Sequence, residues 1–440
     1  MGSFKVHLVH VGNMSNKGSQ ALLKSDVSII EEVLGASVSI SVSTNDIQGV
    51  KKLNLPLNGI FSPVVDIPYE RADSLAKKLN YDRESIRYRL SALAGFVMMP
   101  VQLCLSVFSA LFVKIGIRGF YRSRVLENIK KCDLVISNSD ENFKEGASFL
   151  PTKLTWLLTW WSILVSKTWD VLMVKFFGKP IIMFPNSFGP FKTAVGRILA
   201  KTALNRYSLI LLRDGISFSL AESMLGCPKI RTNDIVWLFE SNACPHAKLG
   251  NASFVGVSPG IYSHVLSKAK TEDHISLFAR TLDKSIALFG FHFVFLPQYV
   301  TGFQYDDLDI SKMIIAEMKN KNNVEIAEIE NADDLKSYVN MMKMVISSKL
   351  HPSVMALASS VPTVCIAYDQ KQVGLFEAVG LADCVIPLHA LSEERLLQKI
   401  GFTWGNQEQI RKALAAQSCS IRKNVKETIS HALHTALTKK

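Results

Sequence analysis

Short apolar runs alternate with longer amphipathic segments along most of the chain. Such runs, bounded by turn residues, are typical of buried parallel strands, and the segments between them have the length of connecting helices. In the first half we expect strands at residues 5–11, 36–43, 133–139, 179–184 and 208–212. In the second half we expect strands at residues 254–258, 291–297, 324–329, 344–348 and 363–368. This alternation predicts an α/β protein with two Rossmann-like, doubly wound domains that face a cleft.

The length of the chain favours two domains, because 440 residues exceed the usual size of one. We expect an N-terminal domain over residues 1–245 and a C-terminal domain over 246–405, joined by a linker at 240–252. A hydrophobic helical insertion interrupts the first domain at about 80–178. The chain ends in a basic helix within 406–440, which could return to the first domain.

Two apolar segments dominate the insertion. Residues 91–113 contain no charged side chain, and residues 154–174 are nearly as apolar and rich in tryptophan. Either segment is long enough to cross a bilayer. A single crossing would separate the first two strands from the rest of their sheet, and the strand at 133–139 lies between the two segments. We therefore expect both segments to lie in the plane of a membrane surface.

A buried helical hairpin or an oligomer interface is the alternative for these two segments. Tryptophan side chains favour the membrane interface, and nearby basic residues suit anionic lipid headgroups. These basic residues are Lys114, Arg118, Arg122, Arg124, Lys130 and Lys131.

The net charge and the cysteine content limit the classes of partner that the protein is expected to bind. The net charge is +12, which makes phosphates, nucleotides or an anionic membrane plausible partners. Nucleic acid is not expected, because the basic residues are scattered and no nucleic-acid-binding motif is present. Seven cysteines without paired spacing argue against a disulfide framework or a zinc site. We expect the N-terminal segment to be a strand rather than a signal peptide. We expect a cytoplasmic protein attached to the cytoplasmic face of the membrane, with no metal and no cofactor.

The apolar run at 344–348 ends at Lys349, Leu350 and His351. Pro352 follows at a position where the first turn of a helix tolerates proline. A cation and a titratable imidazole are thus expected at the carboxyl end of a strand, beside a helix N-terminus, where open α/β sheets bind ligands and helices favour anions. The alternative for His351 is a helix cap or a packed core histidine.

Other polar residues also follow predicted strands. Asn16 and Gly18 lie in the turn after the first strand, which is neither a dinucleotide fingerprint nor a P-loop and could be a plain tight turn. Ser187 lies in the turn 185–191, and Arg213 and Asp214 end the strand at 208–212. Arg213 is a candidate for binding a carboxylate or phosphate, and the alternative is a structural ion pair with Asp214.

Two adjacent carboxylates, Asp306 and Asp307, precede a helix in the second half. Paired carboxylates could orient a sugar, whereas aspartate at the start of a helix is more often a cap.

These segments together resemble the polysaccharide pyruvyl transferase family. The matching residues include Leu350-His351, Val361-Pro362 and the segment Tyr368-Asp369-x-Lys371. Lys349 stands where the family usually has arginine, and Ser19 and Gln20 stand where it usually has an acidic residue. The resemblance covers most of the chain outside 80–178 and implies a GT-B-like arrangement.

The resemblance implies transfer of pyruvate from phosphoenolpyruvate to a pair of sugar hydroxyls on a lipid-linked polysaccharide precursor. His351 would be the general acid, since the unperturbed pKa of histidine, about 6.5, lies near working pH. The implied substrate-binding residues are Arg213, Lys349, Leu350, Asn16, Gly18, Ser187, Tyr368 and Lys371. The alternatives are a membrane-associated GT-B glycosyltransferase that uses a nucleotide-sugar, and a non-catalytic family member in polysaccharide assembly.

Overall fold

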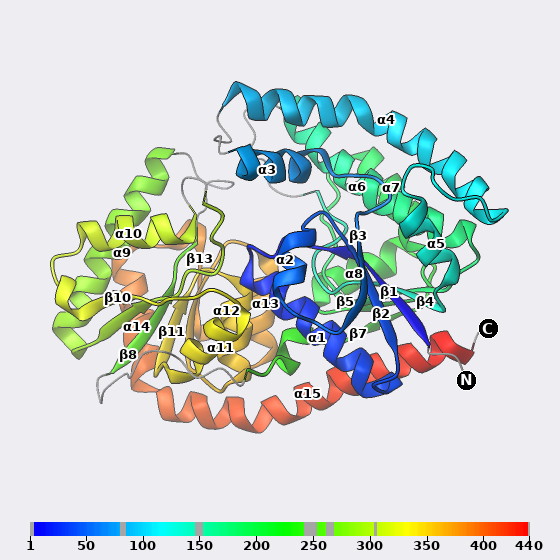
Figure 1. Cartoon of the computed structure of the whole chain (residues 1–440). Helices are drawn as coiled ribbons and strands as arrows, with labels where there is room; N and C mark the ends of the chain where they lie inside the picture. Colours follow the sequence, from blue (N-terminus) through cyan, green and yellow to red (C-terminus); the bar gives the residue numbers. More distant parts are fainter. Residues whose placement is uncertain are drawn as a thin grey trace. The chain divides into compact units, whose positions relative to one another are not determined.

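The computed structural model describes residues 4–79, 85–145, 153–241, 253–260, 268–302 and 306–438. The chain forms two compact units (Figure 1). Unit 1 comprises Met1–Met14, Leu22–Asn233 and Lys426–Lys440, and unit 2 comprises Ser15–Ala21 and Asp234–Val425. Most of the expected linker at 240–252 lies outside the described residues.

Unit 1 is built on a seven-stranded sheet with the order β3-β2-β1-β4-β5-β6-β7, in which every neighbouring pair is parallel. The order reverses between β1 and β4, which creates a topological switch point at the carboxyl ends of these strands. The strands are β1 (Lys5–Val11), β2 (Ser39–Thr44), β3 (Leu57–Phe61), β4 (Leu134–Ser137), β5 (Ile181–Asn186), β6 (Leu209–Leu212) and β7 (Lys229–Arg231).

Unit 2 is built on a six-stranded parallel sheet with the order β10-β9-β8-β11-β12-β13, which reverses between β8 and β11. Its core includes three phenylalanines of consecutive odd numbers, Phe291, Phe293 and Phe295, and Trp404 packs edge-on against Phe291. The strands are β8 (Phe254–Ser258), β9 (His292–Phe295), β10 (Val324–Ile326), β11 (Met344–Ser347), β12 (Thr363–Ala367) and β13 (Val385–Pro387).

Helices connect the strands in both units. The helices before β8 are α1 (Lys17–Leu34), α2 (Ile47–Lys52), α3 (Pro68–Leu79), α4 (Ile86–Lys114), α5 (Ser123–Lys131), α6 (Lys153–Phe176), α7 (Ala194–Leu204) and α8 (Gly215–Met224). The helices after β8 are α9 (Lys268–Phe289), α10 (Asp307–Glu317), α11 (Ala332–Met341), α12 (Leu350–Ala358), α13 (Gln370–Ala378), α14 (Glu393–Gly405) and α15 (Gln407–Thr438). The first turn of α1 belongs to unit 2, and α15 ends in unit 1.

Two Rossmann-like parallel-sheet domains are confirmed, and each of the ten predicted strands has a counterpart in the structure. The edge strand β3 was not among the predicted strands. This edge strand has the sequence LNGIF, and none of its residues is fully buried, so it lacks the continuous apolar run of the central strands. The short edge strands β7 and β13 were also missed.

The two apolar segments of the insertion have different environments. From Leu157 to Phe176, no described residue of α6 is exposed, and Leu164, Val171 and Val174 belong to the core of unit 1. The second segment is therefore a buried helix, which was the alternative to membrane contact. In contrast, α4 exposes large apolar side chains along its length, and among the described helices it is the one long and apolar enough to cross a membrane.

Candidate functional site

The carboxyl end of β11 carries the sequence Lys349-Leu350-His351 into the first turn of α12. The Ser347 hydroxyl accepts a hydrogen bond from Lys349 N (3.1 Å) and donates one to Lys349 O (2.9 Å). This local turn makes Lys349 the N-cap position of α12 and directs the chain from strand to helix. The ammonium group of Lys349 lies 2.9 Å from Asp307 Oδ1.

Asp307 connects the ends of β9 and β11. Its carboxylate is buried and accepts hydrogen bonds from the backbone of Gln298 (3.1 Å) and Tyr299 (2.7 Å), in addition to its ion pair with Lys349. The neighbouring Asp306 caps α10 through Leu308 N and Asp309 N, as the cap interpretation predicted. The two carboxylates therefore have different tasks, and Asp307 is the one that faces the candidate site.

His351 is buried and lies directly against Gly18. A Cβ atom placed on Gly18 would lie 2.2 Å from His351 Nδ1 and 2.7 Å from Gln298 Nε2. The side-chain oxygen of Asn16 accepts hydrogen bonds from Gly18 N (2.9 Å) and from Gln298 Nε2 (2.7 Å). The turn before α1 is therefore held against the end of β9, and only a glycine at position 18 leaves room for the imidazole.

Lys17 belongs to the same cluster and was not predicted. Its side chain is buried, and burial lowers its pKa, while the negative charges of Asp307, Asp306, Asp334 and Glu330 act in the opposite direction. Its backbone N–H donates to Gln298 O (3.1 Å). The signal for Lys17 was its position between Asn16 and Gly18, both of which were predicted as site residues.

Tyr368 and Lys371 follow β12, next to β11 in the sheet. The Gln372 side chain accepts a hydrogen bond from Tyr368 N (3.0 Å) and donates one to Ser348 O (3.3 Å), which holds the ends of the two strands together. Lys371 Nζ lies 3.6 Å from Asp369 Oδ2, and the same carboxylate caps α13. These residues therefore border the segment that carries Lys349.

In unit 1, Ser187 and Arg213 lie together at the carboxyl ends of β5 and β6. Arg213 Nε donates a hydrogen bond to Ser187 Oγ (2.9 Å), which in turn donates to Asp214 Oδ2 (2.6 Å). Asp214 also caps α8 through Ser217 N (2.7 Å). Arg213 is buried, and Ser187 connects it to the carboxylate of Asp214.

The predicted site residues therefore form two groups. Arg213 and Ser187 belong to unit 1, and the other seven belong to unit 2: Asn16, Gly18, Lys349, Leu350, His351, Tyr368 and Lys371. A cleft that joins the two groups stays a prediction. Among the described residues, no group of three His, Cys, Asp or Glu side chains could hold a metal ion.

A second buried polar cluster in unit 1 escaped prediction. His10 has a backbone φ of 64° at the end of β1, and its Nδ1 lies 2.9 Å from Ser137 Oγ. Its Nε2 lies 3.9 Å from Asp170 Oδ2, and Lys167 donates to Asn142 Oδ1 (2.9 Å). Burial raises the pKa of Asp170 to about 7 and lowers the pKa of His10. The sequence suggested membrane contact for the helix that supplies Asp170 and Lys167.

The architecture and the polar strand ends define a two-domain α/β protein with the fold of GT-B enzymes. S. aureus MnaA, solved with UDP, has a similar fold, with a TM-score of 0.57 and 10% identity over 99% of this chain and 97% of MnaA. The UDP-GlcNAc 2-epimerase of Neisseria meningitidis is also similar, with a TM-score of 0.54 and 10% identity over 99% of this chain and all of that chain. At this identity the likeness concerns the fold alone.

The sequence model of the polysaccharide pyruvyl transferase family matches residues 55–370. The chain belongs to this family of transferases. It is also 20% identical over 254 residues to the amylovoran biosynthesis protein AmsJ of Erwinia amylovora, and this match covers 54% of the chain and 61% of AmsJ.

Proposed function

We propose that this protein transfers pyruvate from phosphoenolpyruvate to a pair of hydroxyl groups on a sugar of a lipid-linked polysaccharide precursor. Membership of the polysaccharide pyruvyl transferase family supports the reaction class, and the similarity to AmsJ supports a role in polysaccharide biosynthesis. The observation that carries the proposal is the position of buried His351 beside Lys349, at the carboxyl end of β11 and against the turn that carries Lys17.

The charges of this cluster suit the donor. Phosphoenolpyruvate brings a carboxylate and a phosphate, and Lys17 and Lys349 supply positive charge beside the buried Asp307, while the negative charges of Asp306, Asp334 and Glu330 also act on Lys17. In the free protein, Asp307 balances one of these charges, so donor binding would compete with the carboxylate for the ammonium of Lys349. Arginine would bind the donor with two parallel hydrogen bonds, whereas lysine acts as a point charge on a flexible side chain that can exchange one anion for another.

The chemistry requires one proton donor. His351 gives a proton to the methylene carbon of phosphoenolpyruvate, which becomes a methyl group and leaves C2 positively charged. One sugar hydroxyl then adds to C2, its proton returns to His351, and the phosphate leaves by breaking its C2–O bond. The second hydroxyl adds to C2, and its proton is taken up by the released phosphate. Two C–O bonds form and one breaks, which gives a pyruvate ketal and inorganic phosphate.

The test compares His351→Gln with the control His389→Gln, which changes an exposed histidine that follows β13. Both variants and the wild type are incubated with phosphoenolpyruvate and a membrane extract containing lipid-linked glycans in D₂O. Released phosphate and deuterium in the ketal methyl group are measured. Loss of a general acid lowers a rate by roughly 10²–10⁴-fold, so His351→Gln should be nearly inactive and His389→Gln fully active. Turnover by His351→Gln at the wild-type rate would refute the role of His351 as the general acid. If the wild type instead releases UDP or GDP when it is incubated with nucleotide-sugars, the reaction is glycosyl transfer.

We further propose that α4 attaches the protein to the cytoplasmic face of the membrane. The polarity of this helix is inverted relative to a water-exposed helix, which normally buries its apolar face. Polar and small residues, together with Met99 and Val113, face the protein. Gln102 Oε1 accepts from Asp66 N (2.9 Å), and Ser106 Oγ accepts from Trp169 Nε1 (2.7 Å). Large apolar residues at helical spacing are exposed on the opposite side, namely Ile86, Leu90, Leu93, Val97, Val101, Phe108 and Leu111.

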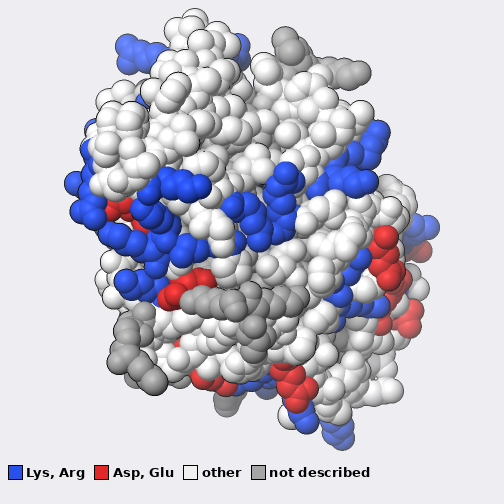
Figure 2. Space-filling model, turned by 90° about the vertical axis from the view of Figure 1, so that its right-hand side faces the viewer, with Lys and Arg blue, Asp and Glu red and all other residues white. Residues whose placement is uncertain are grey.

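Lipid is the expected occupant of this face because the charges fit. The helix contains no acidic residue, and basic residues stand at both of its ends: Arg87 and Arg89 at the start, Lys114 and Arg118 at the end. On the face that Figure 2 shows, Lys and Arg side chains form a band beside a broad uncharged area. Basic residues that flank an apolar face attract anionic headgroups.

The sheet of unit 1 argues for a helix that lies on the membrane rather than across it. The chain reaches α4 from β3 and returns to the same sheet at β4, where β4 pairs directly with β1. A single crossing by α4 would place β1 and β4 on opposite sides of the bilayer. The attachment is therefore in the membrane plane.

Flotation with phosphatidylcholine vesicles, with and without phosphatidylglycerol, tests this attachment. The double variant Val97→Asp/Phe108→Asp places charges on the exposed face of α4, where the two side chains are 67% and 60% exposed. Leu288→Asp on α9 is the matched control, since that leucine is 63% exposed in unit 2. We expect the wild type and the control to float with anionic vesicles and the double variant to stay in solution. Equal flotation of all three proteins would contradict the assignment of α4.

A further inference from the structure

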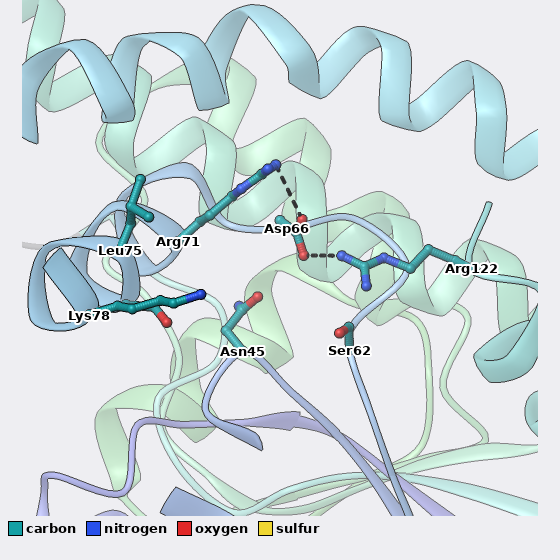
Figure 3. Close-up of a pocket in the computed structure, with 8 residues that line it drawn as sticks. Asn45, Ser62, Asp66, Arg71, Leu75, Lys78 and Arg122 are labelled. Atoms are coloured by element: carbon teal, nitrogen blue, oxygen red, sulfur yellow. Dashed lines mark hydrogen bonds and ion pairs between the residues drawn. The ribbon is translucent and has the colours of Figure 1, made fainter. Parts of the chain in front are cut away.

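A cavity of about 380 Å³ lies in unit 1, at the carboxyl ends of β2 and β3. Asn45 follows β2, Ser62 follows β3, and α3 contributes Arg71 and Lys78. In Figure 3 the polar ends of these side chains and of Arg122 point toward a common space, and α4 passes above it. Open α/β sheets bind ligands at this edge, yet none of the family motifs described above contributes a residue to the cavity.

Positive charge exceeds negative charge in this cavity. Asp66 binds both guanidinium groups, with Arg122 Nη2 at 2.5 Å and Arg71 Nη1 at 3.7 Å. Within the described part of the chain, no carboxylate forms an ion pair with Lys78. The lining of the cavity thus contains three cations and one carboxylate. In addition, Arg122 Nε is buried and has no hydrogen-bond partner among the described residues.

The carboxyl groups of Glu70 and Asp73 do not line the cavity. Glu70 accepts a hydrogen bond from Asn45 Nδ2 (2.6 Å), and burial raises the pKa of Glu70, with the charge of Lys167 acting against this rise. Asp73 is buried as well and accepts a hydrogen bond from Tyr88 OH (2.9 Å). Each of the two carboxyl groups therefore has a hydrogen-bond partner, and Glu70 fixes the orientation of the Asn45 amide.

The shape and the charges suit a phosphate-bearing ligand. Two planar guanidinium groups and a flexible ammonium are the groups that bind phosphate oxygens in proteins, and hydroxyl and amide groups such as Ser62 and Asn45 suit the sugar next to a phosphate. The volume is at the lower end of the range of small-molecule sites, about 300–1,000 Å³. We propose that this cavity binds a phosphate group of the lipid-linked glycan acceptor.

The connection to a lipid comes from α4. Gln102 of α4 accepts a hydrogen bond from the backbone of Asp66, and Gly95 packs on Pro68 at the start of α3. The same α3 exposes Leu75 at the cavity and Leu79 one turn further. A phosphate in the cavity would thus lie beneath the helix whose apolar face is proposed to meet the membrane. The assignment of this phosphate to the acceptor rests on the proposed function, whereas the phosphate site itself does not.

Binding of two probes tests the site without any turnover. Inorganic diphosphate is titrated calorimetrically, and phosphatidylcholine vesicles doped with farnesyl diphosphate are tested by flotation. The variant Arg71→Gln/Lys78→Gln removes the two cations that are most exposed, and Lys201→Gln, an exposed lysine on α7 of the same unit, is the matched control. We expect the double variant to bind both probes at least about tenfold more weakly and the control to bind as the wild type does. Unchanged affinity of the double variant for both probes would overturn the proposal.

Titration with phosphoenolpyruvate separates the acceptor from the donor. We expect the double variant to bind phosphoenolpyruvate as the wild type does, whereas a parallel loss would mean that the cavity holds the donor phosphate and would overturn the acceptor assignment. His351→Gln should bind diphosphate normally. If no protein turns over phosphoenolpyruvate but diphosphate binding still depends on Arg71 and Lys78, the phosphate site stands and the proposed reaction falls.

Discussion

The contact between Gly18 and His351 gives the sharpest prediction. In Gly18→Ala, the new methyl group would lie 2.2 Å from His351 Nδ1 and 2.7 Å from Gln298 Nε2. Ordinary contact needs about 3.5 Å, so the imidazole must move by more than about 1 Å. His351 is buried in the first turn of α12 and Gln298 is hydrogen-bonded to Asn16, so neither side chain can yield freely.

Two effects of opposite sign set the magnitude. Forcing an extra methyl group into a packed site costs about 1–3 kcal/mol. Replacing glycine by alanine inside a helix stabilises it by about 1 kcal/mol, and Gly18 lies in the first turn of α1. The net change in the free energy of unfolding is therefore a loss of roughly 0–2 kcal/mol. The proposed activity should fall much further, since a misplacement of about 1 Å at a reacting group can cost about 10²-fold in rate.

Gly374→Ala is the matched control, because Gly374 lies inside α13 and a Cβ there would meet nothing within 4 Å. Urea unfolding followed by far-UV circular dichroism should show that the control is slightly more stable than the wild type. Phosphate release from phosphoenolpyruvate should be normal in the control and strongly reduced in Gly18→Ala. The reasoning fails if Gly18→Ala is stabilised as much as the control and retains full activity.

Two further predictions concern buried charges. Lys349→Met leaves the buried carboxylate of Asp307 without its cation, although two backbone N–H groups still bind it. Urea unfolding should therefore show that the free energy of unfolding falls by about 1–3 kcal/mol. A second change, Asp307→Asn, should recover part of this loss, and a single variant as stable as the wild type would contradict the ion pair. Burial raises the pKa of Asp170 from 3.8 to about 7, so between these pH values the folded state holds a proton that the unfolded state has lost. The free energy of unfolding should therefore fall as pH rises from about 4 to about 7. The expected decrease is roughly 4 kcal/mol, at about 1.4 kcal/mol per pH unit. Asp170→Asn should remove this component, while the opposite contribution of buried His10 remains in both proteins, so parallel pH profiles of wild type and variant would disprove the assignment.

The candidate site was predictable as far as local sequence specifies it. An apolar run that ends in Lys349 and His351 fixes where these side chains leave the strand, because strand and helix are both local structures. The sequence did not reveal the contact between Gly18 and His351, or the hydrogen bond between Asn16 and Gln298, which are 282 positions apart. Such contacts depend on the packing of the segment Ser15–Ala21 into unit 2, although β1, which precedes this segment, belongs to the other sheet. Asp307 and Lys17 acquired their importance in the same way.

The sequence by itself determined the two parallel sheets, because buried parallel strands require continuous apolar runs, and these runs are visible in the order of residues. It also determined that α4 and α6 are apolar helices. Only the tertiary structure decided which way each helix faces: α6 buries its apolar residues in the core of unit 1, whereas α4 turns Gln102 and Ser106 inward and most of its leucines and valines outward. The periodicity of a helix shows that two faces differ, but the direction of each face depends on the partners that the fold brings to it.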